Sequence, residues 1–390
     1  MSYCFASTNK GLEKLLIEEI KQLGATEILE TTAGAQFEAD ELTIMKINLL
    51  SRFASRVMLQ VGFGSYRDCD DIYKIAHKIK WEEWFSHKHS IKVATNAIHS
   101  PLKSLDFVTL KVKDAICDSF VDKVNFRPDV DKFNPDIKIY NFLTNDTITI
   151  YVDTSGEALF KRGYRQNKLE APLKENLAAG LIALSNWTPE IALFDPMCGS
   201  GTILIEAISK GLNIAPGLNR SFGFEKLQMF DLTKWESLKL EAKNAINLNV
   251  ALKIYANDID RNAIQILKDN LKYLKIDGIE NLIQFHNMDF LDVNAPEATG
   301  ILITNPPYGI RLEEQDDLAS LYPKIATHLK NNYSGWDCFF LTADLRMPKL
   351  MRLNTSRKTP IFNGPLECRL FEFKMVSGSN RIIKSNDKSV

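Results

Sequence analysis

The chain has 390 residues, of which 45% are hydrophobic, 10% aromatic and 25% charged. These proportions are typical of folded globular proteins and exclude disordered, collagen-like and membrane-spanning classes, while the length indicates two or three domains. The formal net charge of −1 excludes binding of nucleic acid through overall positive charge, so any such binding must use a local patch.

The first residues, Met1–Phe5, lack the basic segment and the apolar run of a secretory signal, and no stretch approaches 18 uncharged apolar residues. We therefore expect a cytoplasmic protein with no contact to a membrane. The six cysteines form no Cys-x-x-Cys pair, and His87 and His89 have no partner at metal-ligand spacing, so we expect reduced thiols and no metal site.

Two α+β patterns follow one another in the first 154 residues. The first predicts strands at 3–7, 36–39 and 56–63 with helices at 12–23 and 41–53, which is the rhythm of a ferredoxin-like unit. The second predicts helices at 70–79 and 104–121 and strands at 90–95, 136–142 and 147–153. Because neither pattern contains a glycine-rich loop or a carboxylate cluster, we expect a binding or positioning role for this part of the chain.

Residues 160–375 alternate apolar strand runs with helical patterns, which predicts a doubly wound, mostly parallel sheet. One buried strand, 191–195, runs directly into a turn that contains Gly199 and Gly201. Glycine lets the backbone turn sharply and approach a ligand, and the N–H groups of a helix start favour an anionic group. Leu204 stands where the dinucleotide fingerprint needs a third glycine, and a plain tight turn remains the alternative. The polar stretch 376–390 is expected to fray.

Acidic residues end the next two strands of this pattern. Asp258 can accept hydrogen bonds from both hydroxyls of a ribose, whereas Asp260 fits better as the N-cap of the following helix. Asp289 and Phe290 suit an adenine, with the carboxylate on the amine and the ring against the base, although a turn-forming Asp gives the same pattern. These strand ends are expected to meet at one edge of the sheet, where open α/β sheets hold ligands.

A fourth apolar strand ends at Asn305-Pro306-Pro307-Tyr308, the most specific motif in the chain. The two prolines fix the backbone and remove two N–H donors, so the Asn305 side-chain oxygen and the Pro306 carbonyl can both accept hydrogen bonds from an exocyclic amine. Tyr308 can stack on the same base. A structural diproline turn is the alternative interpretation.

Together, Asp195–Gly201 and Asn305–Tyr308 resemble the class I S-adenosylmethionine-dependent amino-methyltransferases. More narrowly, the segments 152–165, 170–179 and 363–370 resemble the bacterial THUMP-domain 23S rRNA guanine-N2 methyltransferases, and the similarity covers nearly the whole chain. The resemblance implies S-adenosylmethionine as cofactor, 23S rRNA or a large-subunit precursor as partner, and methylation of the exocyclic N2 of a guanine.

The same resemblance implies four parts of the chain: a ferredoxin-like domain at 1–62, a THUMP RNA-binding domain at 63–155, a Rossmann-like methyltransferase domain at 156–378 with an antiparallel hairpin near 337–376, and a flexible tail at 379–390. It also places Asn176 at the methionine end of the cofactor. The residues expected to bind the cofactor are Asn176, Asp195, Pro196, Met197, Cys198, Gly199, Gly201, Thr202, Asp258, Ile259, Asp289 and Phe290. The residues expected to act in catalysis are Asn305, Pro306, Pro307 and Tyr308.

A local basic run with an aromatic residue inside it is the candidate RNA-binding segment, with a solvated linker as the alternative. It consists of Lys161, Arg162, Tyr164, Arg165 and Lys168. Three other functions stay open at this point: tRNA guanine-N2 methylation, DNA adenine-N6 methylation, which the Asn-Pro-Pro-Tyr motif fits equally well, and a noncatalytic RNA-binding assembly factor.

Overall fold

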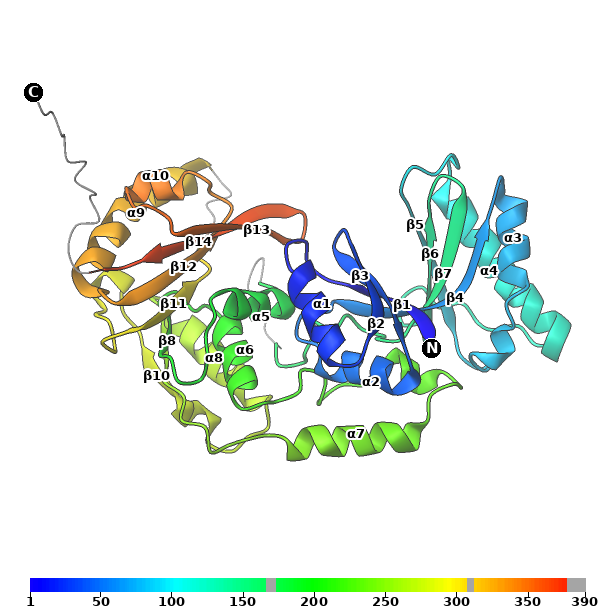
Figure 1. The fold of residues 1–390 in the computed structure, drawn as a ribbon, viewed down its shortest axis with the longest axis horizontal. Coiled ribbons are helices and arrows are strands. Elements are labelled where there is room, and N and C mark those ends of the chain that lie inside the picture. The colour runs from blue at the N-terminus through cyan, green and yellow to red at the C-terminus, as the bar shows by residue number, and fades with distance from the viewer. Residues whose placement is uncertain (166–172, 307–311, 377–390) are drawn as a thin grey trace, which may run out of the picture. The chain divides into compact units, whose positions relative to one another are not determined.

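The computed structural model of the protein describes residues 1–165, 173–306 and 312–376 (Figure 1). The chain divides into two compact units. The first unit comprises Met1–Arg165, Lys174–Gly180 and Leu212–Leu248, and the second comprises the other described residues. The tail expected to fray lies outside the described residues from position 377 onward.

A seven-stranded sheet of order β2-β3-β1-β4-β7-β6-β5 organises the first unit. Neighbouring strands in it are antiparallel, except β5 and β6, which are parallel. Its strands are β1 (Ser2–Ser7), β2 (Thr26–Thr31), β3 (Gly34–Ala39), β4 (Arg56–Ser65), β5 (Ile91–Ala97), β6 (Ile137–Leu143) and β7 (Thr147–Asp153). The sequence did not predict β2, because its residues are mostly exposed and its pairing with β3 is interrupted by a register shift between Thr26 and Leu29.

Helices pack on this sheet, with α3 beside α4, and one of them, α7, packs on α2 (Figure 1). The helices are α1 (Glu13–Gln22), α2 (Glu41–Leu50), α3 (Cys69–His77), α4 (Leu105–Val124) and α7 (Leu232–Asn244), with single turns η1 (Trp81–Glu83) and η2 (Gly223–Lys226). Asp40, Asp68 and Ser104 accept hydrogen bonds from backbone N–H groups at the starts of α2, α3 and α4. The ranges of α1, α2, α3 and α4 confirm the four helices expected in the first 154 residues.

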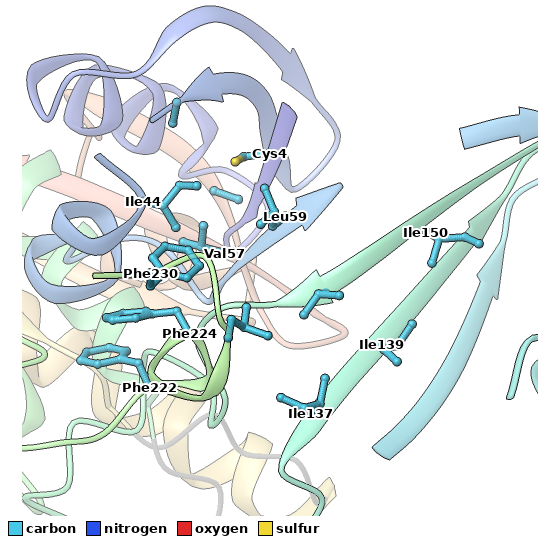
Figure 2. Close-up of a cluster of buried hydrophobic side chains, with 14 of the residues drawn as sticks. Cys4, Ile44, Val57, Leu59, Ile137, Ile139, Ile150, Phe222, Phe224 and Phe230 are labelled. Atoms are coloured by element: carbon cyan, nitrogen blue, oxygen red, sulfur yellow. The ribbon is translucent and has the colours of Figure 1, made fainter. Parts of the chain in front are cut away.

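The core of the first unit includes residues from far along the chain. Figure 2 shows Phe222, Phe224 and Phe230 near Ile44 and Val57 in one buried cluster. The phenylalanines belong to the stretch 212–248, which lies inside the sequence range expected to form the methyltransferase domain. Burial of large aromatic rings is strongly favourable, and this attaches the stretch to the first unit.

A second seven-stranded sheet, of order β10-β9-β8-β11-β12-β14-β13, organises the second unit. From β10 to β12 all neighbours are parallel, and β14 pairs antiparallel with both β12 and β13. The strands are β8 (Leu193–Asp195), β9 (Ile254–Asn257), β10 (Ile283–His286), β11 (Gly300–Thr304), β12 (Trp336–Thr342), β13 (Arg357–Asn363) and β14 (Leu366–Lys374). Every residue of β8, β9 and β11 is buried, as expected for parallel strands covered on both faces.

This arrangement confirms the expected doubly wound, mostly parallel sheet with a carboxy-terminal antiparallel hairpin, preceded by α+β structure. The helix α5 (Glu175–Leu184) precedes its first strand, and the helices between its strands are α6 (Thr202–Gly211), α8 (Arg261–Lys272), α9 (Leu312–Asn332) and α10 (Met347–Met351), with single turns η3 (Ile279–Leu282) and η4 (Phe290–Asp292). Up to Gly180, α5 belongs to the first unit. Within the described residues, no helix has the length and apolar character needed to cross a membrane, and no group of His, Cys, Asp or Glu could hold a metal ion.

Candidate cofactor and base site

Four adjacent parallel strands place the predicted functional residues at one edge of the second sheet. The strands β10, β9, β8 and β11 lie in that order and run in the same direction, so their carboxyl ends share an edge. Asp195 is the last residue of β8, and Asp258, Asp289 and Asn305 come shortly after β9, β10 and β11. The expected meeting of these strand ends is confirmed by the topology.

Two glycines in the loop after β8 have different tasks. A side chain at Gly201 would clash with Leu267 of α8, so this glycine lets the loop pack against a helix. A side chain at Gly199 would meet nothing within 4 Å, so its backbone faces open space. Both residues have positive φ angles, +52° and +78° at Gly199 and Gly201, which glycine adopts readily. The loop therefore leaves room for a ligand beside Gly199, immediately before α6 begins.

Asp258 joins the end of β9 to this glycine loop. One carboxylate oxygen accepts a hydrogen bond from the N–H of Gly199 at 2.8 Å, and the other accepts from the N–H of Asp260 at 3.0 Å. Asp260 accepts from the N–H of Asn262 at 2.8 Å, which confirms it as the N-cap of α8. A negative group is thus fixed beside the open face of Gly199.

Asn257, which the sequence reasoning missed, ties three strand ends together. Its fully buried side-chain amide donates to the carbonyls of Pro196 and Met288, both at 3.0 Å, and its side-chain oxygen accepts from the N–H of Met288 at 3.1 Å. Its own carbonyl accepts from the N–H of Cys198 at 2.9 Å. An Asn closing an otherwise apolar strand was the available signal, because a buried amide must find partners.

Asp195 is almost completely buried, and that burial raises the pKa of its carboxyl group to about 7. The hydroxyl of Thr304 and the N–H of Met197, 3.2 Å away, oppose the shift, while the negative charge of Asp258 adds to it. Two carboxylates in one neighbourhood disfavour each other's charge. A cationic ligand group would remove that penalty, so the pair is suited to bind one.

Beyond β10 the structure separates Asp289 from Phe290. Asp289 is exposed and accepts from the N–H of Leu291 at 2.9 Å, as a turn-forming Asp would. Phe290 is buried in the core, where its ring packs at 5.2 Å from that of His328. Contact of this pair with an adenine stays a prediction. The neighbouring loop exposes the apolar side chain of Ile259, which is 70% accessible, and its contact with the cofactor stays a prediction.

Asn305 and Pro306 directly follow β11, with Asn305 half-buried and Pro306 buried. Their position in the sheet puts the motif next to the glycine loop after β8, because β11 pairs with β8. Pro307 and Tyr308 lie outside the described residues, so their predicted roles stay predictions.

Asn176 belongs to a different compact unit from the other predicted cofactor ligands. It belongs to the first unit, whereas the other eleven residues belong to the second. Its side-chain amide donates to the carbonyl of Phe53 at 3.1 Å and to the hydroxyl of Ser55 at 2.9 Å. These bonds hold the start of α5 to the loop before β4, and a cofactor contact of Asn176 stays a prediction.

Two of the four described residues of the predicted basic run are buried. Arg162 is only 6% exposed, and its guanidinium donates to the carbonyls of Leu159 and Arg52, both at 2.7 Å. Tyr164 is 3% exposed. These two side chains therefore stabilise the first unit and do not present a basic surface to solvent.

The rest of the run is engaged in ion pairs where the structure describes it. Arg165 lies 3.8 Å from Glu175, and both side chains are largely buried. Lys161 is exposed and pairs with Glu157 at 2.5 Å. Lys168 lies outside the described residues. Arg162 and Tyr164 are thus buried while Lys161 is exposed, and contact of this run with RNA stays a prediction.

Family comparisons agree with this arrangement. Residues 162–372 match the model of the RMKL-like methyltransferase domain, residues 66–153 match the THUMP domain, and residues 3–58 match the RlmL ferredoxin-like domain. A curated relative, the ribosomal RNA large subunit methyltransferase K/L of Shewanella frigidimarina (strain NCIMB 400), is 38% identical over 97% of this chain and 53% of its own length. The chain thus spans about half the length of the curated relatives it matches.

Solved structures resemble the whole chain. A possible methylase from Clostridium difficile 630 is 33% identical and superimposes with a TM-score of 0.87, covering 97% of this chain and 99% of its own. SMU.472, a chain described as a methyltransferase and solved with SAH, is 29% identical with a TM-score of 0.86 and the same coverage. With the family model matched over more than half of its length, and with the glycine loop and the Asn-Pro motif on adjacent strands, the chain belongs to the RMKL-like methyltransferase family.

Proposed function

We propose that this chain is an S-adenosylmethionine-dependent RNA methyltransferase that methylates the exocyclic N2 of a guanine in 23S rRNA or its large-subunit precursor. The observation that supports this most strongly is the shared edge of β8 and β11. It brings the loop with Gly199 and the motif that starts at Asn305 onto neighbouring strands. Direct transfer requires the methyl donor and the amine acceptor to lie in contact, and loops at the ends of neighbouring strands can hold them so.

The described residues fit the proposed cofactor. Asp195 and Asp258 supply negative charge, and Gly199 leaves open space between the end of β8 and the start of α6. We assign the methionine end to the loop after β8 and the nucleoside end to Asp258 and Ile259. When bound, S-adenosylmethionine would supply an electrophilic methyl group on a sulfonium. SMU.472, which contains SAH, supports the assignment by similarity.

The chain's own contribution to the transfer is to position the amine. We propose that the Asn305 side-chain oxygen and the Pro306 carbonyl accept hydrogen bonds from the two N–H groups of the guanine amine. Those hydrogen bonds help the nitrogen become pyramidal and stabilise the positive charge that develops as its bond to carbon forms. The surplus proton then leaves the nitrogen for solvent, so no strong general base is required. The base must first leave its stack, which costs a few kcal/mol in paired RNA.

Mass spectrometry of nucleosides tests this function directly. rRNA from a strain that lacks the gene should lose one N2-methylguanosine of 23S rRNA, and the purified chain should restore it from S-adenosylmethionine. Complementation with Asn305→Ala should not restore it. An unchanged N2-methylguanosine content in the deletion strain would overturn the proposal.

Side-by-side labelling separates the other functions. The purified chain is given labelled S-adenosylmethionine with deproteinised 23S rRNA, large-subunit precursor particles, tRNA or duplex DNA. Label in tRNA alone or in DNA adenine alone would replace the rRNA proposal by one of those activities. Titration calorimetry with SAH tests the noncatalytic reading, because a chain without a working pocket should release no binding heat.

A further inference from the structure

The connection 125–136, between α4 and β6, is held in place although it contains no helix or strand. Val130 forms a bridge to Ile91 at the start of β5, where the N–H of Ile91 donates to the carbonyl of Asp129 at 2.8 Å. The carboxylate of Asp131 accepts from the N–H groups of Phe133 and Asn134, at 2.8 and 3.0 Å. These bonds fix the backbone on both sides of Phe133.

Two aromatic rings in this connection are exposed. The residue Phe133 is 97% accessible, so its ring buries almost no area and adds almost nothing to folding. Phe126 is 59% accessible and stacks on His87, with ring centroids 4.7 Å apart and planes 12° apart. That geometry leaves the other face of Phe126 available. Exposed aromatic rings on a backbone held by hydrogen bonds can serve as platforms on which unpaired bases stack.

Lysines are the sequence neighbours of His87 and Phe133. Lys88 follows His87 and is exposed, and Lys132 precedes Phe133 and is also exposed. Lys92 reaches the connection through a hydrogen bond from its ammonium to the carbonyl of Lys132 at 2.8 Å. Phosphates beside a stacked base would find positive charge at these lysines.

The acidic side chains of this region are largely engaged within the protein. Asp131 is used in the turn described above, and the pKa of its carboxyl is lowered by those backbone N–H groups. Asp136 pairs with Lys226 at 2.5 Å and accepts from Ser90. Arg127 lies 4.0 Å from Asp114, so part of its charge is balanced. Asp129 is exposed and contributes a local negative charge. The charge of this region is therefore mixed, and the exposed lysines are its cationic groups for a phosphate.

We infer that the connection 125–136, with His87 and Lys88, is a stacking site for unpaired bases of RNA. Phe133 and the free face of Phe126 take the bases, and Lys88 and Lys132 contact the backbone phosphates. The inference rests on the proposed RNA substrate and adds to it a binding site outside the methyltransferase sheet. It also gives RNA a surface in the first unit, where Arg162 and Tyr164 are buried.

Binding of a defined oligonucleotide tests the site without any methyl transfer. The probe is a fluorescein-labelled 12-nucleotide oligouridylate with a central 2-aminopurine, titrated with the full-length chain. Phe133→Ala should weaken binding about tenfold, as expected for one lost stacking contact. Phe133→Trp should restore affinity and quench the 2-aminopurine. Phe107→Ala is the matched control, because Phe107 is a half-exposed phenylalanine on α4, outside the connection, and should bind as wild type.

Salt dependence separates stacking from charge. Lys132→Ala should flatten the dependence of the dissociation constant on salt, whereas Phe133→Ala should leave that slope unchanged. Wild-type affinity of Phe133→Ala and Phe126→Ala for the oligonucleotide, or unquenched 2-aminopurine at saturation, would overturn the inference. The exposed rings would then be assigned to contact with a protein.

The outcome is distinguishable from failure of the proposed function. If the wild-type chain methylates 23S rRNA while Phe133→Ala keeps both the oligonucleotide affinity and the KM for rRNA, only the stacking site is wrong. If Phe133→Ala weakens the oligonucleotide but the wild-type chain methylates no RNA, the stacking site stands and the proposed activity fails.

Discussion

Two buried aspartates, one in each unit, end a strand and look alike in sequence, but their surroundings differ. Asp153 ends β7, and its carboxylate forms an ion pair with Arg56 and accepts from the N–H of Ser155 at 2.9 Å. Asp195 ends β8, and among the described residues the charge that acts on its carboxyl group, in addition to burial, is that of a second carboxylate, Asp258. Burial raises the pKa of both groups, to about 6 for Asp153 and about 7 for Asp195.

The difference between the neighbours of Asp153 and Asp195 shows how an acidic residue that stabilises the fold can be told from one that binds a ligand. Asp153 has its counter-charge within the protein, so its charge is used to hold β4, β7 and the following turn together. For Asp195 the described residues supply a like charge, which adds to the larger cost of burying its carboxylate, and a cationic ligand would offset both. A buried acid whose neighbourhood lacks a balancing cation is therefore a candidate for ligand binding.

The largest expected effect is on the structural side of this comparison. Asp153→Ala should lower the free energy of unfolding by about 3–5 kcal/mol, because it leaves the mostly buried Arg56 without its partner. Urea unfolding measures this. The control is Glu157→Ala, an exposed partner of Lys138 and Lys161, which should cost about 1 kcal/mol or less. Equal losses in both variants would remove the distinction between the two aspartates.

Asn305→Ala tests the ligand side. Turnover should fall about 100-fold or more, as is typical when a group that stabilises developing charge is removed. The dissociation constant for SAH and the urea midpoint should stay near those of the wild type. A parallel loss of cofactor affinity would show that Asn305 supports the cofactor pocket and not the base.

Asp258→Ala should have the reverse profile. Loss of the hydrogen bonds that the ribose hydroxyls donate to this charged acceptor should raise the dissociation constant of S-adenosylmethionine about 10- to 100-fold. Turnover at saturating cofactor should change little. Because Asp258 also holds the N–H of Gly199, Asp258→Asn serves as the control that keeps one acceptor oxygen. Turnover that stays low at saturation would contradict this division of roles.

The smallest expected effect is a pH dependence. Below a pKa of about 7 the carboxyl of Asp195 is protonated in the free protein, so a cationic ligand loses its counter-charge. Affinity for S-adenosylmethionine should therefore weaken about tenfold from pH 8 to pH 6, one power of ten for each pH unit below the pKa. Calorimetry in buffers of different ionisation enthalpy should detect proton release on binding. Asp195→Asn should bind with no such dependence, and a slope of opposite sign would refute the assignment.

Periodicity and local chemistry were enough to predict most of the elements. The apolar runs that became β8, β9 and β11 are fully buried, and a parallel strand needs little more than such a run. Asp260 was recognised as a cap because capping depends on neighbours in sequence. The strand β2 was not predicted, because its residues are mostly exposed and show no apolar alternation.

What the sequence by itself determined about this protein is therefore the local part: the order of strands and helices, the glycine turn and the Asn-Pro motif. Only the tertiary structure decided which polar groups form hydrogen bonds within the protein and are not available to a ligand. Arg162 and Tyr164 read as a basic, aromatic surface until carbonyls and core were seen around them, and Asn257 read as one more strand residue until it was seen to bond two other loops. The physical reason is that a charge or an amide is defined by its partners, and those partners come from distant parts of the chain.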